Sequence, residues 1–271
     1  MSRATSEGRS TSGPLVVFKL QSPARMLSAE VRSTAARRAF SAELLGTLLL
    51  AFFTLGVVIV TGGMVGERLS SSRLLVTSLA HGVAFGLLVF TMAGVSGGHL
   101  NPVLTLGAVI TRQVALPRGL TYLAAQLAGA VAGAVLLKLA LPAGVPLAHG
   151  VPGLGPRVTP EAALVVEGVL AFTLTLVFLA SAARGPAVLP VVLGLTTALG
   201  RLFGTALTGA PMNPALAFGV ALTAAAWGGH WIWWVGPLMG SALAAVCWRS
   251  WPPSKAGESG KAGGDGGRSW R

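Results

Sequence analysis

Residues 96–107 read SGGHLNPVLTLG, and residues 208–219 read TGAPMNPALAFG. The two stretches share Gly, Asn, Pro, Leu and a final Gly at matching positions, and their Asn-Pro pairs begin at Asn101 and Asn213, 112 residues apart. Proline is favoured in the first turn of a helix, and asparagine is a good cap just before it. Each stretch therefore predicts a short helix that begins at Asn-Pro, over about residues 101–112 and 213–226.

The chain around these two segments is strongly apolar. Of its 271 residues, 53% are hydrophobic and only 10% are charged, and no Asp, Glu, Lys or Arg occurs over residues 44–66, 74–110 or 202–248. A helix needs roughly 20 apolar residues to cross a bilayer, whereas a soluble helix needs a polar face. The composition excludes ordinary soluble and disordered classes. It predicts spans at about residues 40–63, 74–94, 119–141, 161–183, 186–207 and 230–248.

The two Asn-Pro segments are too short to cross a bilayer, so we expect them to be re-entrant. Repeat one covers about residues 40–141 and repeat two about residues 161–249, each with three spans and one half-helix. Three is an odd number, so the second half must be inverted relative to the first, as in transporters built from inverted repeats. The predicted fold class is an all-α membrane protein with six transmembrane helices and two re-entrant half-helices.

The charges predict how the chain lies in the membrane. The net charge is +12, and basic residues gather in a tail over residues 1–39 and in a Gly- and Ser-rich tail over residues 250–271. An even number of spans puts both tails on one side, which the positive-inside rule makes the cytoplasm, at the plasma membrane or an intracellular membrane. The tails can contact anionic lipids. We expect no nucleic-acid partner, because no aromatic residues are interleaved with the basic ones.

The two half-helices predict the chemistry of the region between the repeats. Two half-helices that enter from opposite faces bring their N-termini together, and each N-terminus carries roughly +0.5 charge. Such a centre repels cations and protonated water, while the amides of Asn101 and Asn213 donate hydrogen bonds to a passing water. The residues expected at this pore centre are Asn101, Pro102, Val103, Asn213, Pro214 and Ala215.

These motifs resemble the major intrinsic proteins, the family of aquaporins and glycerol facilitators. The resemblance covers about residues 40–249 and rests on AExxGT at 42–47, SGGHLNPV at 96–103, Gln126, GxxMNPA at 209–215 and HWIxWxGP at 230–237. It implies a homotetramer with one pore per subunit. It also implies a passive channel for water, with small neutral solutes such as ammonia or hydrogen peroxide as further permeants, that excludes protons and ions. No enzymatic activity and no cofactor are expected.

Glu43 and Glu167 stand inside predicted spans, and intramembrane acids are functional candidates by default. The resemblance implies that Glu43 and Glu167 brace the two half-helix loops by accepting backbone hydrogen bonds. A catalytic role is not expected, because no nucleophile or paired acid is apparent. His99 and His230 are expected to form hydrogen bonds near loops rather than to bind metal, since four scattered histidines and Cys247 make no ligand cluster.

The family has a second constriction built from four positions, and its spacing assigns these to His81, Arg201, Ala210 and Leu216. Most members carry Arg where Leu216 stands, and His or an apolar residue where Arg201 stands. A lone Arg within a span costs roughly 2.5–3.5 kcal/mol, so Arg201 is not expected to face lipid. One hypothesis is that Arg201 replaces the missing filter Arg from another wall. The alternative is that it snorkels to the membrane face.

The same positions bear on the permeant. His81 resembles the branch of the family that admits ammonia and hydrogen peroxide, and Trp233-Trp234 resembles the aromatic pair of water channels. Ala217 stands where glycerol facilitators carry Asp, and Ala210 replaces the Cys that makes many water channels sensitive to mercury. Water is therefore the main expected permeant. The alternatives are a glycerol facilitator, a gradient-driven secondary transporter, and a non-conducting structural junction homologue.

Overall fold

A computed structural model describes residues 33–64, 69–183 and 187–251, and the basic tails expected at 1–39 and 250–271 lie largely outside these described residues. The described part is helical. Its α-helices are α2 (Thr34–Val58), α3 (Ser71–Ser96), α4 (Pro102–Ile110), α5 (Leu116–Ala140), α6 (Pro160–Ala182), α7 (Leu189–Thr208), α8 (Pro214–Ala224) and α9 (Ile232–Ser250). Two short elements complete it: the π-helical turn η1 (Ile59–Gly63) and the 3-10 helix η2 (Leu147–Gly150).

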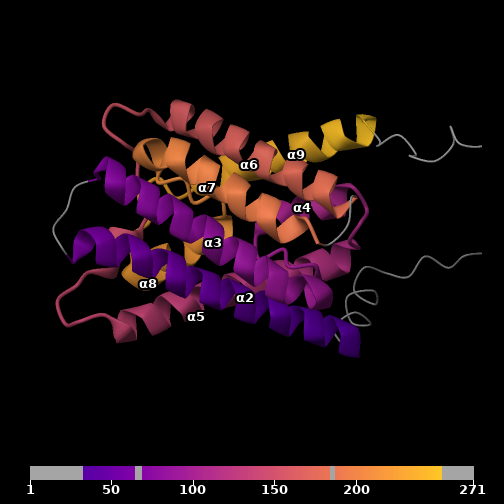
Figure 1. The fold of residues 1–271 in the computed structure, drawn as a ribbon, viewed down its shortest axis with the longest axis horizontal. Helices are drawn as coiled ribbons and strands as arrows, with labels where there is room; N and C mark the ends of the chain where they lie inside the picture. Colours follow the sequence, from indigo (N-terminus) through magenta and orange to yellow (C-terminus); the bar gives the residue numbers. More distant parts are fainter. Residues whose placement is uncertain (1–32, 65–68, 184–186, 252–271) are drawn as a thin grey trace, which may run out of the picture.

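The long helices form one bundle whose axes run between two ends (Figure 1). Five helical stretches in the described residues are long and apolar enough to cross a membrane: residues 34–62, α3, α5, α6 and α7. The sixth long helix, α9, has 19 residues and contains Pro237. The start of α2 and the end of α9 lie at the same end of the bundle, called here the terminal end, and the α2–α3 and α5–α6 connections lie at the opposite, distal end. This is the expected all-α membrane fold.

The first long helix begins earlier than the apolar pattern predicts. It starts at Thr34 rather than near residue 40, because the Ser33 side chain accepts a hydrogen bond from Ala36 N and caps it. Arg37 and Arg38 are exposed in its first two turns. Hydropathy marks where a helix enters an apolar medium, whereas the cap sets where the helix begins.

The internal repeat is visible in the packing. Helix α2 packs on α5 in the first half, α6 packs on α9 in the second, and α3 packs on α7 across the two halves. The half-helices are exchanged: α8 packs on α5, and α4 packs on α9. Small residues permit these contacts, because a Cβ on Gly129 would collide with the backbone of Leu44, and one on Gly240 with the backbone of Gly168. Close contacts at small residues are typical of helices packed within a membrane.

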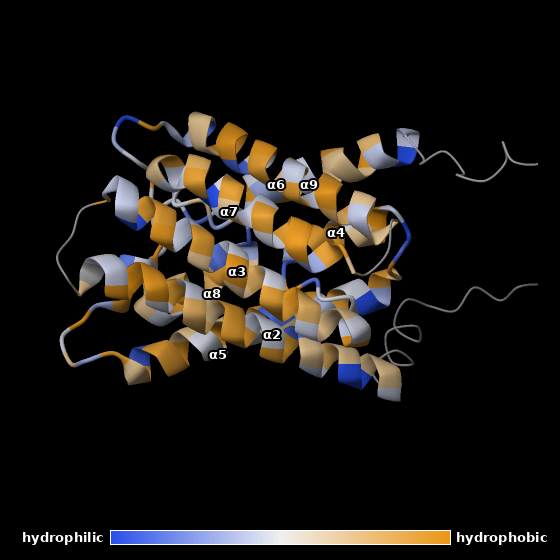
Figure 2. Cartoon of the chain, viewed as in Figure 1, coloured by the Kyte–Doolittle hydropathy of each residue, from blue (hydrophilic) through white to orange (hydrophobic). Residues whose placement is uncertain are grey.

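The outward faces of the long helices are apolar over most of their length, while polar residues are more frequent at the two ends (Figure 2). Large apolar side chains are exposed on these outward faces, including Val83, Leu87 and Phe90 on α3 and Val191 and Leu195 on α7. An exposed apolar surface of this extent suits contact with lipid rather than water. The polar side chains that matter for chemistry are therefore those enclosed by the bundle.

Candidate functional site

The two half-helices begin at their Asn-Pro pairs as expected. Asn101 and Asn213 are extended N-caps whose Oδ1 atoms accept hydrogen bonds from Val103 N at 2.9 Å and Ala215 N at 3.1 Å. Pro102 and Pro214 occupy the first helical position, where a missing N–H removes no intrahelical bond. All six residues expected at the pore centre are buried.

The two caps are also joined across the repeat. Asn101 Nδ2 donates to the carbonyl oxygen of Met212, and Asn213 Nδ2 donates to that of Leu100, both at 2.9 Å. Leu100 and Met212 each adopt a left-handed backbone, with φ of 50° and 48°. An amide NH2 group carries two hydrogens, and one on each Asn is committed to the opposite loop.

Glu43 holds the first loop from α2. Its Oε1 accepts from Ser96 Oγ at 2.6 Å and His99 N at 2.9 Å, and its Oε2 accepts from Leu100 N at 2.7 Å and Gln126 Nε2 at 2.8 Å. The side chain is fully buried. Four donors on one carboxylate satisfy a buried charge that would otherwise be strongly unfavourable.

The second loop repeats part of this arrangement around Glu167 on α6. Its Oε1 accepts from Thr208 Oγ1 at 2.6 Å, as Glu43 accepts from Ser96. The same hydroxyls also accept backbone N–H groups in the loops, Ser96 from Gly98 and Thr208 from Ala210, both at 3.1 Å. The two loops are thus built on one pattern.

Sequence reasoning did not predict that four residues hold these loops. Besides Ser96 and Thr208, the Tyr122 hydroxyl donates to Ser96 O at 2.7 Å and Trp233 Nε1 donates to Thr208 O at 3.0 Å. Tyr122 and Trp233 are 111 residues apart, within one residue of the offset between the two Asn-Pro pairs. The repeat was the available signal, but a Tyr aligned with a Trp does not stand out by residue type.

Two adjoining cavities run along the interior beside these loops. The larger, of about 190 Å³, opens toward the distal end and is called here the distal cavity. The smaller, of about 20 Å³, is lined by both Asn101 and Asn213 and by the apolar side chains Leu50, Phe85 and Leu174. His81, Pro211 and Leu216 line both cavities. The half-helix caps thus line a narrow cavity that adjoins the wider distal cavity.

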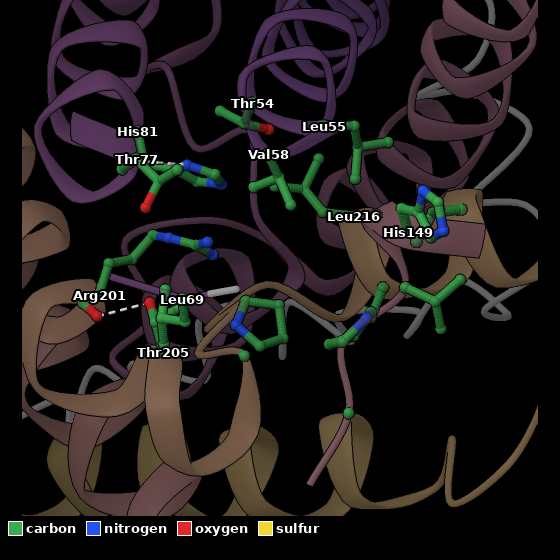
Figure 3. A pocket seen from close by; sticks show the side chains of 18 of the residues that line it. Thr54, Leu55, Val58, Leu69, Thr77, His81, His149, Arg201, Thr205 and Leu216 are labelled. Atoms are coloured by element: carbon green, nitrogen blue, oxygen red, sulfur yellow. Dashed lines mark hydrogen bonds between the residues drawn. The ribbon is translucent and has the colours of Figure 1, made fainter. Parts of the chain in front are cut away.

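Arg201 and His81 face the distal cavity (Figure 3). Arg201 is only 5% exposed, and its Nη1 donates to Ala210 O at 3.2 Å. His81 Nδ1 lies 3.1 Å from Thr77 O. A carbonyl can only accept, so Nδ1 carries a hydrogen and Nε2 of the neutral ring is an acceptor. The cavity wall therefore presents guanidinium donors and, at His81, an imidazole acceptor.

Leu216 and Ala210, the other two residues expected at the second constriction, differ in whether their side chains line a cavity. Leu216 lines both cavities, so its apolar side chain stands close to His81 and Arg201. Ala210 is fully buried and its side chain lines neither cavity, although its carbonyl holds Arg201. Ala210 has a left-handed backbone with φ of 42°, and its N–H donates to Thr208 Oγ1 while its carbonyl accepts from Arg201.

His99 and His230 form hydrogen bonds, as expected. His99 Nδ1 lies 3.1 Å from Thr105 Oγ1, which also receives Gln126 Nε2 at 3.0 Å. His230, just before α9, accepts a hydrogen bond from Trp234 Nε1 at 3.0 Å, and partial burial lowers its pKa. Both rings therefore hold loops and helix ends in place.

Comparisons with known proteins agree on one family. A family model described as "Major intrinsic protein" matches residues 30–248. The chain is 42% identical to the lens fiber major intrinsic protein of Gallus gallus and 39% identical to aquaporin-5 of Mus musculus, in each case over 80% of this chain and 82% of the relative. The X-ray structure of the aquaglyceroporin from Plasmodium falciparum has the same fold, with a TM-score of 0.71 and 23% identity over 79% of this chain and 95% of that chain.

Proposed function

The chain belongs to the major intrinsic protein family of membrane channels, and we propose that it conducts water passively down osmotic gradients while excluding protons and ions. The observation that carries the proposal is the narrow cavity lined by both Asn101 and Asn213 directly below a cavity lined by Arg201 and His81. A single file of water in this path would meet a fixed set of donors at two levels.

The proposed exclusion of cations has two sources. The N-termini of α4 and α8 meet near the caps, and each carries roughly +0.5 charge. Arg201 adds a full charge in the distal cavity, where its burial limits screening by solvent. We propose that Arg201, His81 and Leu216 form the selectivity filter, with Ala210 holding Arg201 through its carbonyl.

Small neutral solutes are the second proposed class of permeant. Ammonia and hydrogen peroxide can donate to His81 Nε2 and accept from Arg201, as water does. Glycerol is less well matched, because the cavity wall carries Ala217 where glycerol facilitators carry Asp. Water remains the main proposed permeant, and glycerol facilitation the alternative.

The proposed assembly and orientation follow the family and the charges. We propose a homotetramer in the membrane with both termini in the cytoplasm. Arg37, Arg38 and Arg249 lie at the terminal end of the bundle, which supports this orientation by the positive-inside rule. Native mass spectrometry of the detergent-solubilised chain tests the tetramer.

Stopped-flow light scattering of proteoliposomes tests the function. An inward osmotic gradient of sucrose should shrink the vesicles several-fold faster than empty liposomes, with low activation energy and no dependence on ion gradients. Parallel runs with glycerol, urea, ammonia and hydrogen peroxide rank the solutes. Shrinkage no faster than that of empty liposomes supports the structural junction homologue, and flux that requires an ion gradient supports a secondary transporter.

A further inference from the structure

The distal cavity carries more positive charge than a filter for neutral solutes requires. Arg73, at the start of α3, lines it together with Arg201, and no Asp or Glu is among the described residues of its lining. His149, Thr77 and Thr205 complete its polar wall. The carboxylate that attracts Arg201 is Glu167, which is buried on α6 and hydrogen-bonded to Thr208. Two arginines against one carboxylate leave the cavity positive.

Both arginines are held in place before any ligand arrives. Arg73 Nη2 donates to Val58 O at 3.1 Å, and its guanidinium lies so close to Gly62 in η1 that a Cβ there would collide with it. Arg201 is held by its hydrogen bond to Ala210 O, and only 5% of the residue is exposed. A fixed guanidinium loses little side-chain freedom when it binds an anion.

Arg201 also retains a donor without a partner. Its Nε is buried, and no acceptor among the described residues lies within hydrogen-bonding distance of it. A buried N–H without a partner is unfavourable by about 1–3 kcal/mol. The enclosed Nε is not itself reached from the cavity, but a ligand that offers oxygens in one plane can accept two parallel hydrogen bonds from the other nitrogens of a guanidinium.

We propose that the distal cavity binds a small monovalent oxyanion between Arg201 and Arg73, and that the bound anion blocks water flux. The cavity of about 190 Å³ has room for such an anion together with a few waters. The anion does not pass further, because the next cavity is only about 20 Å³ and is lined by Leu50, Phe85 and Leu174. A cavity of this size holds little more than one water, so an anion would have to leave its own waters behind to enter it, which is unfavourable.

Nitrate is a suitable probe because it is planar and its charge does not change near neutral pH. Isothermal titration with nitrate measures binding to the purified chain directly, and stopped-flow shrinkage of proteoliposomes measures the block. Nitrate is placed at equal concentration on both sides of the vesicles so that channels of either orientation are reached. Chloride replaces nitrate at constant ionic strength, because a spherical ion does not offer a guanidinium edge two oxygens in one plane.

The variants separate the site from general charge effects. Arg201→Met and Arg73→Met should each raise the half-maximal nitrate concentration about tenfold or more, which is the loss of about 1.4 kcal/mol. Arg201→Lys keeps the charge without the planar fork and should have an intermediate effect. Lys138→Gln is the matched control, because Lys138 is exposed at the distal end of α5 and does not line the cavity. Its half-maximal concentration should stay within about twofold of wild type.

The inference rests on the proposed function only for the flux measurement. Nitrate binding that depends on both arginines in a chain that passes no water would support the site and contradict the proposed function. Absence of nitrate binding to the wild-type chain overturns the inference. So does an equal loss of affinity in Lys138→Gln. In a separate run with vesicles that initially contain no nitrate, uptake faster than into empty liposomes would overturn the block and show that the anion passes.

Discussion

The guanidinium of Arg201 donates to the carbonyl oxygen of Ala210, nine residues later, at 3.2 Å. This bond joins α7 to the loop that leads to the second Asn-Pro pair. It holds a full positive charge against the cavity wall, opposite His81 and close to Leu216. A charge placed in this way has a measurable consequence for ions.

Replacing Arg201 by Val should make the channel leak cations. A unit charge at about 4 Å opposes a cation by about 1 kcal/mol even in water, so the leak should rise roughly fivefold or more. Potassium and proton fluxes into proteoliposomes, followed with indicator dyes, measure it. Arg157→Gln is the control, because Arg157 is exposed in the α5–α6 connection and lines neither cavity. An unchanged leak and unchanged solute selectivity in Arg201→Val would remove Arg201 from the filter.

Replacing Glu43 by Gln should lower the thermal stability of the folded chain. The carboxylate accepts four hydrogen bonds, whereas an amide has one acceptor oxygen and an NH2 group that faces donors. Each buried donor left unpaired is unfavourable by about 1–3 kcal/mol. The loss of monodisperse protein on heating in detergent, followed by size-exclusion chromatography, measures the change. Glu161→Gln makes the same substitution at an exposed position on α6 and should shift the midpoint far less; equal shifts would contradict the bracing role.

Replacing Asn213 by Asp should weaken the barrier to cations at the centre. A carboxylate cannot donate a hydrogen bond to Leu100 O, and its negative charge offsets the partial positive charge at the N-terminus of α8. We expect a cation leak at least about fivefold above wild type, from the same order of Coulomb energy. Gln113→Glu is the control, because it converts an exposed amide to a carboxylate after α4, away from both cavities. A leak of the same size in both variants would show that the position of the charge does not matter.

Micromolar mercuric ion should leave water flux intact. Ala210 carries no thiol, and Cys247, near the end of α9, lines neither cavity. Thr205→Cys should create sensitivity, because Thr205 lines the distal cavity beside Arg201. Stopped-flow rates before and after mercuric chloride, and after a thiol reductant, measure the effect. Strong inhibition of the wild-type chain that persists in Cys247→Ser would contradict the alignment on which the filter positions rest.

Much of the fold was predictable because it depends on local rules. Asn followed by Pro determines where α4 and α8 begin, since capping and proline geometry act within a few residues. Long uncharged stretches mark the helices that meet lipid. The start of α2 was predicted too late, because Ser33 caps a helix that extends beyond its apolar part.

The candidate site was predictable in part. The repeat placed Asn101 and Asn213 in equivalent positions, and the family resemblance implied that Glu43 and Glu167 brace the loops. Neither showed that Gln126 joins Glu43 or that Tyr122 and Trp233 hold the loops. Those contacts join residues on different helices. Their partners depend on how the helices rotate about their own axes as they pack.

The sequence by itself therefore determined the family, the two half-helices and the inverted repeat. Asn-Pro caps determine locally where each half-helix begins, and an odd number of spans in each half requires the second half to be inverted. Only the tertiary structure decided which way Arg201 points. Its spacing allowed both a pore-facing and a snorkelling side chain, and the packing of α7 against the left-handed loop at Ala210 turned it toward the distal cavity. The same packing brought Arg73 to that cavity from α3, 128 residues away in the chain.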